Sequence, residues 1–348
     1  MNQRKGRETR RPSFREEKMR ILSLAAASVL AITSIVGSQG AQAQQLRLSH
    51  QWSTADLRHQ VAQMIADDLE EADVGLSIRI FPSASLFSAT EQYQPVSRGQ
   101  LDMTVYPLSY AGGQRPEFNL TLMPGLVRNH DHGARLNASP FMERLEELMA
   151  EDDVMVLVHG YLAGGFAAKG ECITRPEHMA GRNVRAAGRA FEQMLAAAGA
   201  SISSMASSEI YNGMQTGVLD AVNTSSSSFV SFRLYEQVDC YTPAGDIALW
   251  FMYQPLLMNK STFEGLSEEQ QEVLLTAAAK AEEWYLEQAK LDDVRSVEVY
   301  QENGVEIAEM SAEDFEAWRA LAMESAYASF VDQVPNGQEL LDMAFEVE

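Results

Sequence analysis

The sequence predicts an α/β fold of two lobes, joined by hinge crossings and by one long helix that spans both lobes. Strand-like and helix-like segments alternate along most of the chain, a pattern typical of a parallel or mixed sheet covered on both faces. A run rich in glycine and alanine, 160–170, suits a bend between two bodies, although it would also suit a turn inside one domain. With 348 residues, the chain is longer than a single domain of roughly 100–200 residues, so we expect two domains.

The first 43 residues are predicted to be an export signal that does not belong to the fold. Their apolar run, 21–36, has sixteen residues, whereas a membrane-spanning helix needs roughly 20. Ala41 and Ala43 fit the small-residue rule for signal cleavage, so we expect export and cleavage near Ala43. A retained amphiphilic anchor is the alternative, and the basic prefix before Met19 leaves the true start codon open.

The charge balance argues against several classes of partner. The formal net charge is −22, and the chain after residue 43 keeps 19 basic and 46 acidic side chains, a formal charge of −27. Such a surface repels phosphate backbones and anionic lipid, which disfavours nucleic-acid binding and membrane-surface binding. We therefore expect a soluble monomer in which an anionic ligand would meet a local positive site.

Lobe I is expected to comprise residues 44–162 and 252–266. It opens with a strand, a helix for which Ser53 and Thr54 offer N-caps, and a second strand, and this rhythm is then repeated. A segment rich in glycine, proline, asparagine and histidine, 112–132, is expected to be a loop. The predicted strands are 46–50, 76–81, 101–106 and 154–159, and the predicted helices are 56–71, 90–98 and 140–151.

Lobe II is expected over residues 163–251, with the same alternation of short strands and helices. Its last strand leads into a long apolar run, 248–258, which suits a strand that returns to lobe I. The predicted strands are 183–186, 202–205, 221–223 and 238–241, and the predicted helices are 189–198, 208–215 and one after the serine tract 225–228.

The lobe-spanning helix is expected over residues 267–303. The stretch Ser267–Gln270 forms a capping box, and Asn303–Gly304 is a signal for a helix C-terminus. At ~1.5 Å per residue, a helix of this length makes a rod of roughly 50 Å, longer than one domain is wide. The C-terminal segment, 304–348, is expected to hold a short strand, a helix opened by Ser311 and a tail.

The sequence contains few of the motifs that catalysis or metal binding requires. No G-x-S-x-G motif occurs, and the glycine-rich run does not continue as a phosphate-binding P-loop. His130 and His132 have a spacing that could bind zinc, but their neighbours have loop character and no further clustered ligand follows. We expect no metal, no cofactor and no catalysis. The alternative, an exported enzyme, would need His130, His132 or His159 to act with a carboxylate.

The chain has two cysteines, Cys172 and Cys240, and both follow the predicted export signal. In an oxidising compartment such a pair can form a disulfide. Two buried thiols are the alternative, because the sequence does not measure the separation of the two side chains.

One arginine in lobe II is a candidate for binding an anion. Arg185 lies in a short predicted strand that leads into a helix, and α/β folds hold ligands outside the carboxyl ends of their strands. A guanidinium can make two parallel hydrogen bonds to a carboxylate, which a lysine cannot. Taken alone, an arginine on a strand is more often a structural ion-pair partner.

The motifs around Arg185 change this interpretation. Gly181-x-x-x-Arg185 is followed by Ser208-Glu-Ile-Tyr211 and by Gln215-Thr-Gly217-Val-Leu-Asp220-Ala221, and lobe I has Phe81-Pro82 and Arg98-Gly-Gln-Leu-Asp102. This order resembles the solute-binding proteins of tripartite ATP-independent periplasmic (TRAP) transporters, the DctP family, over essentially the whole chain after the export signal. The resemblance implies the fold of periplasmic binding proteins, two lobes that close over an organic acid and deliver it to an integral membrane permease.

The resemblance also implies site residues. Arg185 would bind the ligand carboxylate, and Asn223, Thr224 and Ser225 occupy the place of polar ligand contacts. Lys169 lies near the place of a second arginine that sialic-acid-binding members carry, and the lack of that arginine argues against sialic acid. The other candidates lie at strand ends or lobe crossings: His50, Gln51, Trp52, Tyr106, Tyr110, Trp250 and Phe251.

The aromatic candidates favour a hydroxylated, cyclic or aromatic monocarboxylate over a small dicarboxylate. We therefore expect a periplasmic solute-binding protein that is not an enzyme and that acts with the membrane subunits of a TRAP permease. A second hypothesis keeps the fold and the ligand but makes the protein a sensor that reports to a membrane receptor.

Overall fold

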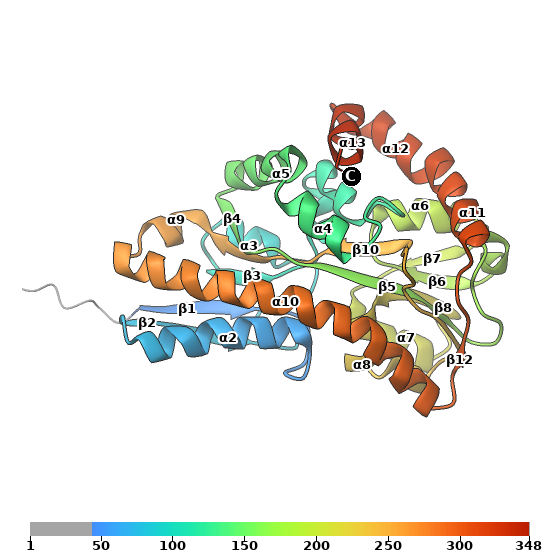
Figure 1. The fold of residues 1–348 in the computed structure, drawn as a ribbon, viewed down its shortest axis with the longest axis horizontal. Helices are drawn as coiled ribbons and strands as arrows, with labels where there is room; N and C mark the ends of the chain where they lie inside the picture. Colours follow the sequence, from blue (N-terminus) through green and yellow to red (C-terminus); the bar gives the residue numbers. More distant parts are fainter. Residues whose placement is uncertain (1–43, 348) are drawn as a thin grey trace, which may run out of the picture. The chain divides into compact units, whose positions relative to one another are not determined.

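The computed structural model describes residues 44–347 (Figure 1). The predicted export signal and its cleavage site near Ala43 lie outside the described residues. Within 44–347, none of the helices combines the length and the apolar character needed to cross a membrane. Strands and helices alternate in this part of the chain and build two separate sheets, as the sequence predicts.

The first sheet, which we use to define lobe I, has five strands in the order β2-β1-β3-β11-β4. Leu46 and Leu48 are buried at alternate positions of β1, which pairs in parallel with β2 and β3. β11 runs antiparallel between β3 and β4 and comes from a distant part of the sequence. The bounds are β1 (Gln44–Ser49), β2 (Leu76–Phe81), β3 (Met103–Val105), β4 (Val154–Val158) and β11 (Leu256–Asn259).

The second sheet, which defines lobe II, has the order β12-β9-β5-β8-β6-β7, with β10 paired to β5. β5 runs antiparallel to β8, β9 and β10, whereas β6 is parallel to both of its neighbours. The bounds are β5 (Tyr161–Ala168), β6 (Asn183–Ala186), β7 (Ser201–Ser204), β8 (Ala221–Ser225), β9 (Cys240–Thr242), β10 (Trp250–Tyr253) and β12 (Glu306–Ile307).

The helices differ from the predictions at several places, and the C-terminal segment expected to end in a tail contains two further helices. Asp56, rather than Ser53 or Thr54, caps the first described helix, because its side chain accepts the backbone N–H of Arg58. The expected loop 112–132 includes a 3₁₀ helix and the start of α4, which Asn129 caps. The α-helices are α2 (Leu57–Ala72), α3 (Tyr93–Ser97), α4 (His130–Asn137), α5 (Pro140–Glu151), α6 (Arg189–Ala197), α7 (Ile210–Gln215), α8 (Ser226–Ser231), α9 (Lys260–Glu264), α10 (Glu268–Glu302), α11 (Ala312–Ala322), α12 (Ala328–Gln333) and α13 (Gly337–Phe345).

The shorter helical elements lie mostly between these helices and strands. A π-helix, η6 (Met323–Tyr327), joins α11 to α12. The 3₁₀ helices are η1 (Leu108–Gly113), η2 (Pro116–Leu122), η3 (Pro176–Met179), η4 (Ser207–Glu209) and η5 (Leu234–Glu236).

The chain crosses between the two sheets at two adjacent points. β4 passes into β5 at His159–Gly160, and β10 passes into β11 at Gln254–Pro255, where the predicted single strand 248–258 is broken. The two crossings are bonded to each other, since Gln254 N–H donates to the Gly160 carbonyl at 2.7 Å. A Cβ at Gly160 would lie 2.0 Å from the Tyr285 ring, so this crossing requires glycine.

The crossings lie close to the predicted lobe boundaries at 162 and 252, but the run 160–170, predicted to be the bend itself, is mostly strand: residues 161–168 form β5, which pairs with three other strands. The crossings differ from those boundaries by a few residues because β5 pairs with β10 from its first residue, Tyr161, and so belongs to the second sheet from there on. The assignment of each segment to a lobe remains our proposal.

The long helix α10 contacts elements of both lobes (Figure 1). Ser267 and Gln270 form its capping box, as the sequence predicts. Its N-terminal part packs on α2 through small buried residues at helical spacing, such as Ala277 and Ala281, and its C-terminal part packs on α8 of lobe II through Tyr300. One helix therefore braces both lobes.

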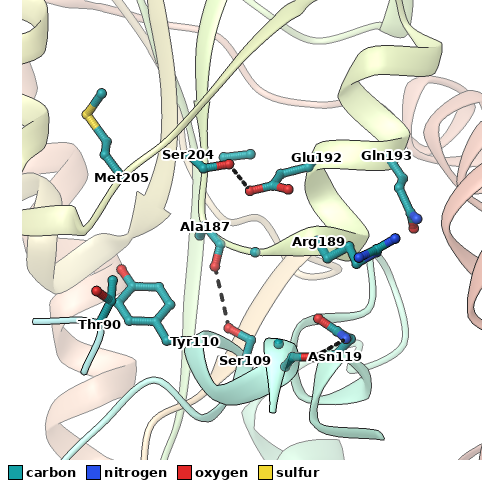
Figure 2. A pocket seen from close by; sticks show the side chains of 14 residues that line it. Thr90, Ser109, Tyr110, Asn119, Ala187, Arg189, Glu192, Gln193, Ser204 and Met205 are labelled. Carbon is teal, nitrogen blue, oxygen red and sulfur yellow. Dashed lines mark hydrogen bonds between the residues drawn. The ribbon is translucent and has the colours of Figure 1, made fainter. Parts of the chain in front are cut away.

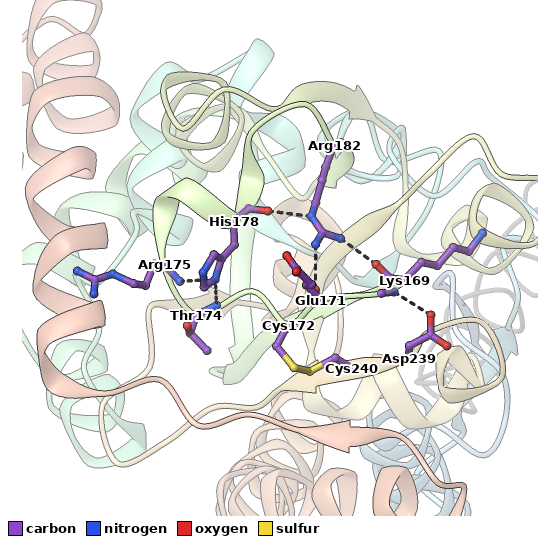
Figure 3. The surroundings of a disulfide bond; sticks show 10 residues. Lys169, Glu171, Cys172, Thr174, Arg175, His178, Arg182, Asp239 and Cys240 are labelled. Atoms are coloured by element: carbon purple, nitrogen blue, oxygen red, sulfur yellow. Dashed lines mark hydrogen bonds between the residues drawn. A yellow bond between two sulfur atoms is a disulfide. The ribbon is translucent and has the colours of Figure 1, made fainter.

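Cys172 and Cys240 form a disulfide in lobe II (Figure 3). It ties the segment after β5 to the first residue of β9. Around it, Arg182 donates to the carbonyls of Lys169, Glu171 and His178, at 2.8–3.0 Å. The disulfide and the three hydrogen bonds of Arg182 thus hold the chain together at one end of the second sheet.

Candidate functional site

Arg185 lies at the end of β6 and is only 1% exposed. Its Nε donates to the Met205 carbonyl at 3.0 Å, and its Nη1 donates to the Asn223 carbonyl at 2.8 Å. Its Nη2 donates to the Tyr110 hydroxyl at 2.8 Å. Because Tyr110 precedes the first crossing and belongs to lobe I, Arg185 lies where the two lobes meet.

The guanidinium of Arg185 has no acidic partner within residues 44–347. Its three acceptors are neutral, and a guanidinium has five N–H donors, so two donors remain for another group. A buried charge is costly unless it is paired. A ligand carboxylate would supply the missing negative charge.

Neighbouring polar groups extend this site. Asn223 of β8 is fully buried, and neither its Oδ1 nor its Nδ2 has a hydrogen-bond partner within residues 44–347. Ser207 N–H donates to the Tyr110 hydroxyl at 3.2 Å, and Ser207 Oγ donates to Gln51 Oε1 at 3.1 Å. A chain of contacts thus leads from Asn223 through Arg185 and Tyr110 to Gln51 of lobe I.

Of the predicted polar contacts, the structure places Thr224 and Ser225 beside Asn223, on the same buried strand. Ser225 also caps α8, because its Oγ accepts the Ser228 N–H at 3.2 Å. The serine hydroxyl therefore has a structural role in addition to the predicted one.

His50 and Trp52 follow β1 and lie beside Gln51 in the buried part of lobe I. Burial, and then the neighbouring His59, lowers the pKa of His50 to about 3, so its ring is neutral near pH 7. The two histidine rings are joined by a hydrogen bond of 3.0 Å between His50 Nε2 and His59 Nδ1. Trp52 lies against the Arg58 guanidinium, 4.0 Å from its ring centroid.

Sequence reasoning missed the buried pair of Asp56 and Arg58, which lies beside Trp52. Arg58 bonds the Asp56 carboxylate at 2.7 Å through both Nε and Nη2, and it also reaches Ser225 of lobe II. The Asp-x-Arg spacing at a helix start was the available signal, because an N-cap carboxylate can bond both the helix N–H groups and a following cation.

The aromatic candidates do not share one position. Trp250 and Phe251 lie on opposite faces of β10, as consecutive strand residues do. The ring of Trp250 lies across Gly164, where a Cβ would be 2.6 Å from it, whereas the Phe251 ring contacts His130 at 5.1 Å between centroids. The Tyr106 hydroxyl donates to the Thr90 carbonyl at 2.8 Å, and its ring contacts Tyr110. Phe251 is therefore on the face turned toward α4, not toward Trp250.

A cavity of about 480 Å³ lies beside the Arg185 site, between the lobes (Figure 2). Its lining includes Tyr110 and Met205, two of the three residues that accept hydrogen bonds from Arg185. The Ser109 hydroxyl of lobe I donates to the Ala187 carbonyl of lobe II at 3.4 Å, a bond drawn as a dashed line in Figure 2. Sequence reasoning singled out neither Ser109 nor Met205, because both face the cavity only through the tertiary fold.

The structure does not bring Lys169 to this site. Lys169 lies at the far end of β5, beside the disulfide (Figure 3), and its Nζ donates to the Met214 carbonyl. The Lys169 N–H bonds the Asp220 carbonyl at 2.9 Å. These contacts place it within lobe II rather than between the lobes.

The histidines considered for metal binding or catalysis are held separately. His130 Nε2 bonds Asp293 at 2.7 Å, and His132 Nε2 bonds the Val347 carbonyl at 3.0 Å. Within the described chain, no group of three or more potential ligands is placed to hold a metal ion. His159, at the first crossing, bonds Tyr253, and burial lowers its pKa to about 4.

The fold and the buried cation between the lobes define a two-lobed solute-binding protein. The chain belongs to the DctP family, bacterial extracellular solute-binding proteins of family 7, whose pattern matches residues 48–333. The resemblance seen in the sequence motifs is thereby confirmed. This family consists of solute-binding proteins.

Individual relatives agree with this assignment. A solute-binding protein of Albidiferax ferrireducens is 34% identical over 87% of this chain and 92% of its own length. The 2,3-diketo-L-gulonate-binding periplasmic protein YiaO of Escherichia coli is 25% identical over 95% of this chain and 100% of its own. The crystal structure of a TRAP periplasmic solute-binding protein from Rhodoferax ferrireducens with bound malonate superposes with a TM-score of 0.83, at 33% identity, covering 87% and 98% of the two chains.

Proposed function

We propose that this protein captures a small organic acid between its lobes and that Arg185 holds the carboxylate of the acid. The buried guanidinium without an acidic partner among residues 44–347 carries this proposal. Its two remaining donors match the two oxygens of a carboxylate. The Asn223 amide, buried and without a protein partner in the described chain, would bond a second polar group of the ligand.

The proposal includes export and delivery. Relatives named as periplasmic proteins support a periplasmic location, with residues 1–43 as a cleaved export signal. The family and the TRAP relative support delivery of the acid to the membrane subunits of a TRAP permease. Binding without chemical change is part of the proposal, so acid recovered from the protein should be unaltered by NMR.

The identity of the acid is best approached with a panel. The relative solved with malonate makes that dicarboxylate the first probe, beside hydroxylated and aromatic monocarboxylates. Thermal-shift measurements with purified protein would rank the acids, and calorimetry would measure the affinity of the best one.

The decisive variant is Arg185→Gln, with Arg182→Gln as its matched control. Arg182 precedes the same strand and, like Arg185, makes three bonds to neutral oxygens, in its case all backbone carbonyls away from the lobe interface. Loss of the two bonds between the Arg185 guanidinium and the ligand carboxylate should weaken binding by about 10²–10⁴-fold, because each charge-assisted bond contributes about 1.5–3 kcal/mol. Equal affinity of the Arg185→Gln and wild-type proteins would exclude Arg185 as the carboxylate site.

A further inference from the structure

Lobe I holds a buried ion pair at the start of α2. Arg58 donates from Nε and Nη2 to the two carboxylate oxygens of Asp56, each at 2.7 Å. The two side chains are 1% and 0% exposed. Both residues belong to lobe I, so the pair itself does not join the lobes.

The other donors of Arg58 reach beyond lobe I. Nη1 donates to Gln254 Oε1 at 2.8 Å, in the second crossing, and to Ser225 Oγ at 3.2 Å. Nη2 donates to Ser228 Oγ at 3.0 Å. From lobe II, Ser231 Oγ donates to the carboxylate of the pair at 2.6 Å. The ion pair is therefore bonded to both ends of α8.

These contacts matter because the desolvation cost of a buried ion pair is offset only when all of its hydrogen bonds are made. All five N–H donors of Arg58 have acceptors in this arrangement, and two of those acceptors are the lobe II residues Ser225 and Ser228. Separation of the lobes would remove them. Closure therefore completes the bonding of a group that is already assembled in lobe I.

We propose that the Asp56–Arg58 pair is a clasp that stabilises the closed arrangement of the lobes by docking on α8. The inference rests on the proposed function, in which closure captures the ligand. Arg58 binds no ligand itself, because its donors are all used. It is a positioning residue: through Ser225 it holds the end of the strand that carries Asn223, and through Gln254 it holds the second crossing.

The test removes the lobe II side of the clasp and leaves the ion pair intact. Ser228→Ala with Ser231→Ala deletes two of these contacts. Ser226→Ala is the matched control, because Ser226 is buried on the same helix and makes none of the hydrogen bonds to the ion pair.

Double electron–electron resonance between nitroxides at two exposed positions, Leu86 of lobe I and Val218 of lobe II, would report the lobe separation. It would be measured on the full chain with its disulfide oxidised, without ligand and with saturating malonate. The double serine variant should lower the ratio of closed to open protein by about tenfold or more, as expected for two lost hydrogen bonds, and the control should match wild type.

A double-mutant cycle between Arg58→Lys and Ser228→Ala, read as the same ratio, tests the direct contact. The two effects should be strongly non-additive, whereas independent structural damage would add. Equal ratios in wild type, the serine variant and the control would overturn the clasp, as would a wild type that stays open throughout.

The two proposals fail separately. If malonate changes no distance distribution while the serine variant still differs from wild type, the clasp is supported and malonate is not the ligand. If Arg185→Gln retains full affinity for an acid that closes the lobes, the carboxylate site is wrong, but the effect of the serine variant still decides the clasp.

Discussion

Two buried arginines lie where the lobes meet, and they differ in what neutralises them. Arg58 pairs with Asp56, and all five of its donors have acceptors. Arg185 is equally buried, but its three bonds go to neutral oxygens and no acid of the described chain pairs with it. Two equally buried arginines thus have different roles. Arg58 is structural because the protein supplies its counter-charge, whereas Arg185 is suited to binding because a ligand must supply the counter-charge.

The largest expected effect separates the two arginines by stability. Asp56→Asn leaves Arg58 buried without its counter-charge and should lower the free energy of unfolding by about 3–5 kcal/mol. Arg185→Gln removes an unpaired buried charge, and this gain offsets part of the cost of losing its three hydrogen bonds, so the ligand-free protein should lose less than Asp56→Asn does. Urea unfolding of both variants without ligand measures this difference, and equal losses would contradict the comparison.

The next effect concerns geometry at the ligand site. Arg185→Lys keeps the charge but removes the planar pair of donors, so affinity for the best acid should fall about 10–100-fold while the fold is kept. Calorimetry gives the affinity, and circular dichroism checks the fold. A lysine variant that binds as tightly as wild type would show that charge alone, without the two parallel bonds, is sufficient.

A third prediction uses pH to distinguish the two regions. The pKa of His50, beside the clasp, is lowered to about 3, mainly by burial and then by His59. Its neutral form therefore stabilises the fold fully above pH ~6.5, and this contribution is lost as the pH falls toward 3, by up to about 1.4 kcal/mol per pH unit. Urea unfolding across this range should show a shallower slope for His50→Gln.

Arg185→Gln should leave that slope unchanged, because it alters none of the histidines whose lowered pKa values produce the slope. The pKa of His159 is lowered to about 4 by burial, so His159 adds to the pH dependence of the free energy of unfolding in the same direction. Part of the slope should therefore remain in His50→Gln. An identical slope in wild type and His50→Gln would contradict the assignment.

The smallest expected effect concerns Lys169. Because its ammonium bonds the Met214 carbonyl near the disulfide, Lys169→Gln should change ligand affinity by less than about twofold. Calorimetry beside wild type measures this, and a tenfold loss would mean that the residue reaches the ligand after all.

Much of the architecture could be predicted because it depends on local patterns. The capping box at Ser267 and the helical spacing after it predict α10, and the alternation of strands and helices predicts the two sheets. The single strand expected over 248–258 is two strands in different sheets, because the chain crosses between the sheets at Gln254–Pro255 and no local pattern encodes the change of partner.

The candidate site divides in the same way. Arg185 could be singled out from its strand and its neighbouring motifs, and the segment around it, 181–189, contains no acid that could pair with it. Tyr110, Met205 and Ser207 complete the site from separate segments. The sequence predicts the same role for Trp250 and Phe251, but their strand places the two side chains on opposite faces.

By itself, the sequence determined the two-lobed α/β pattern, the long helix, the family resemblance and the choice of Arg185 as the candidate anion site. Each of these depends on patterns of residues that are close together in the chain. Only the tertiary structure decided that no acid of the described chain pairs with Arg185 and that residues of lobe II complete the bonding of Arg58. Such contacts act over a few ångströms in space: the counter-charge of Arg58 lies two residues away at Asp56, but the neutral acceptors that complete its bonding are 167–196 residues away in sequence.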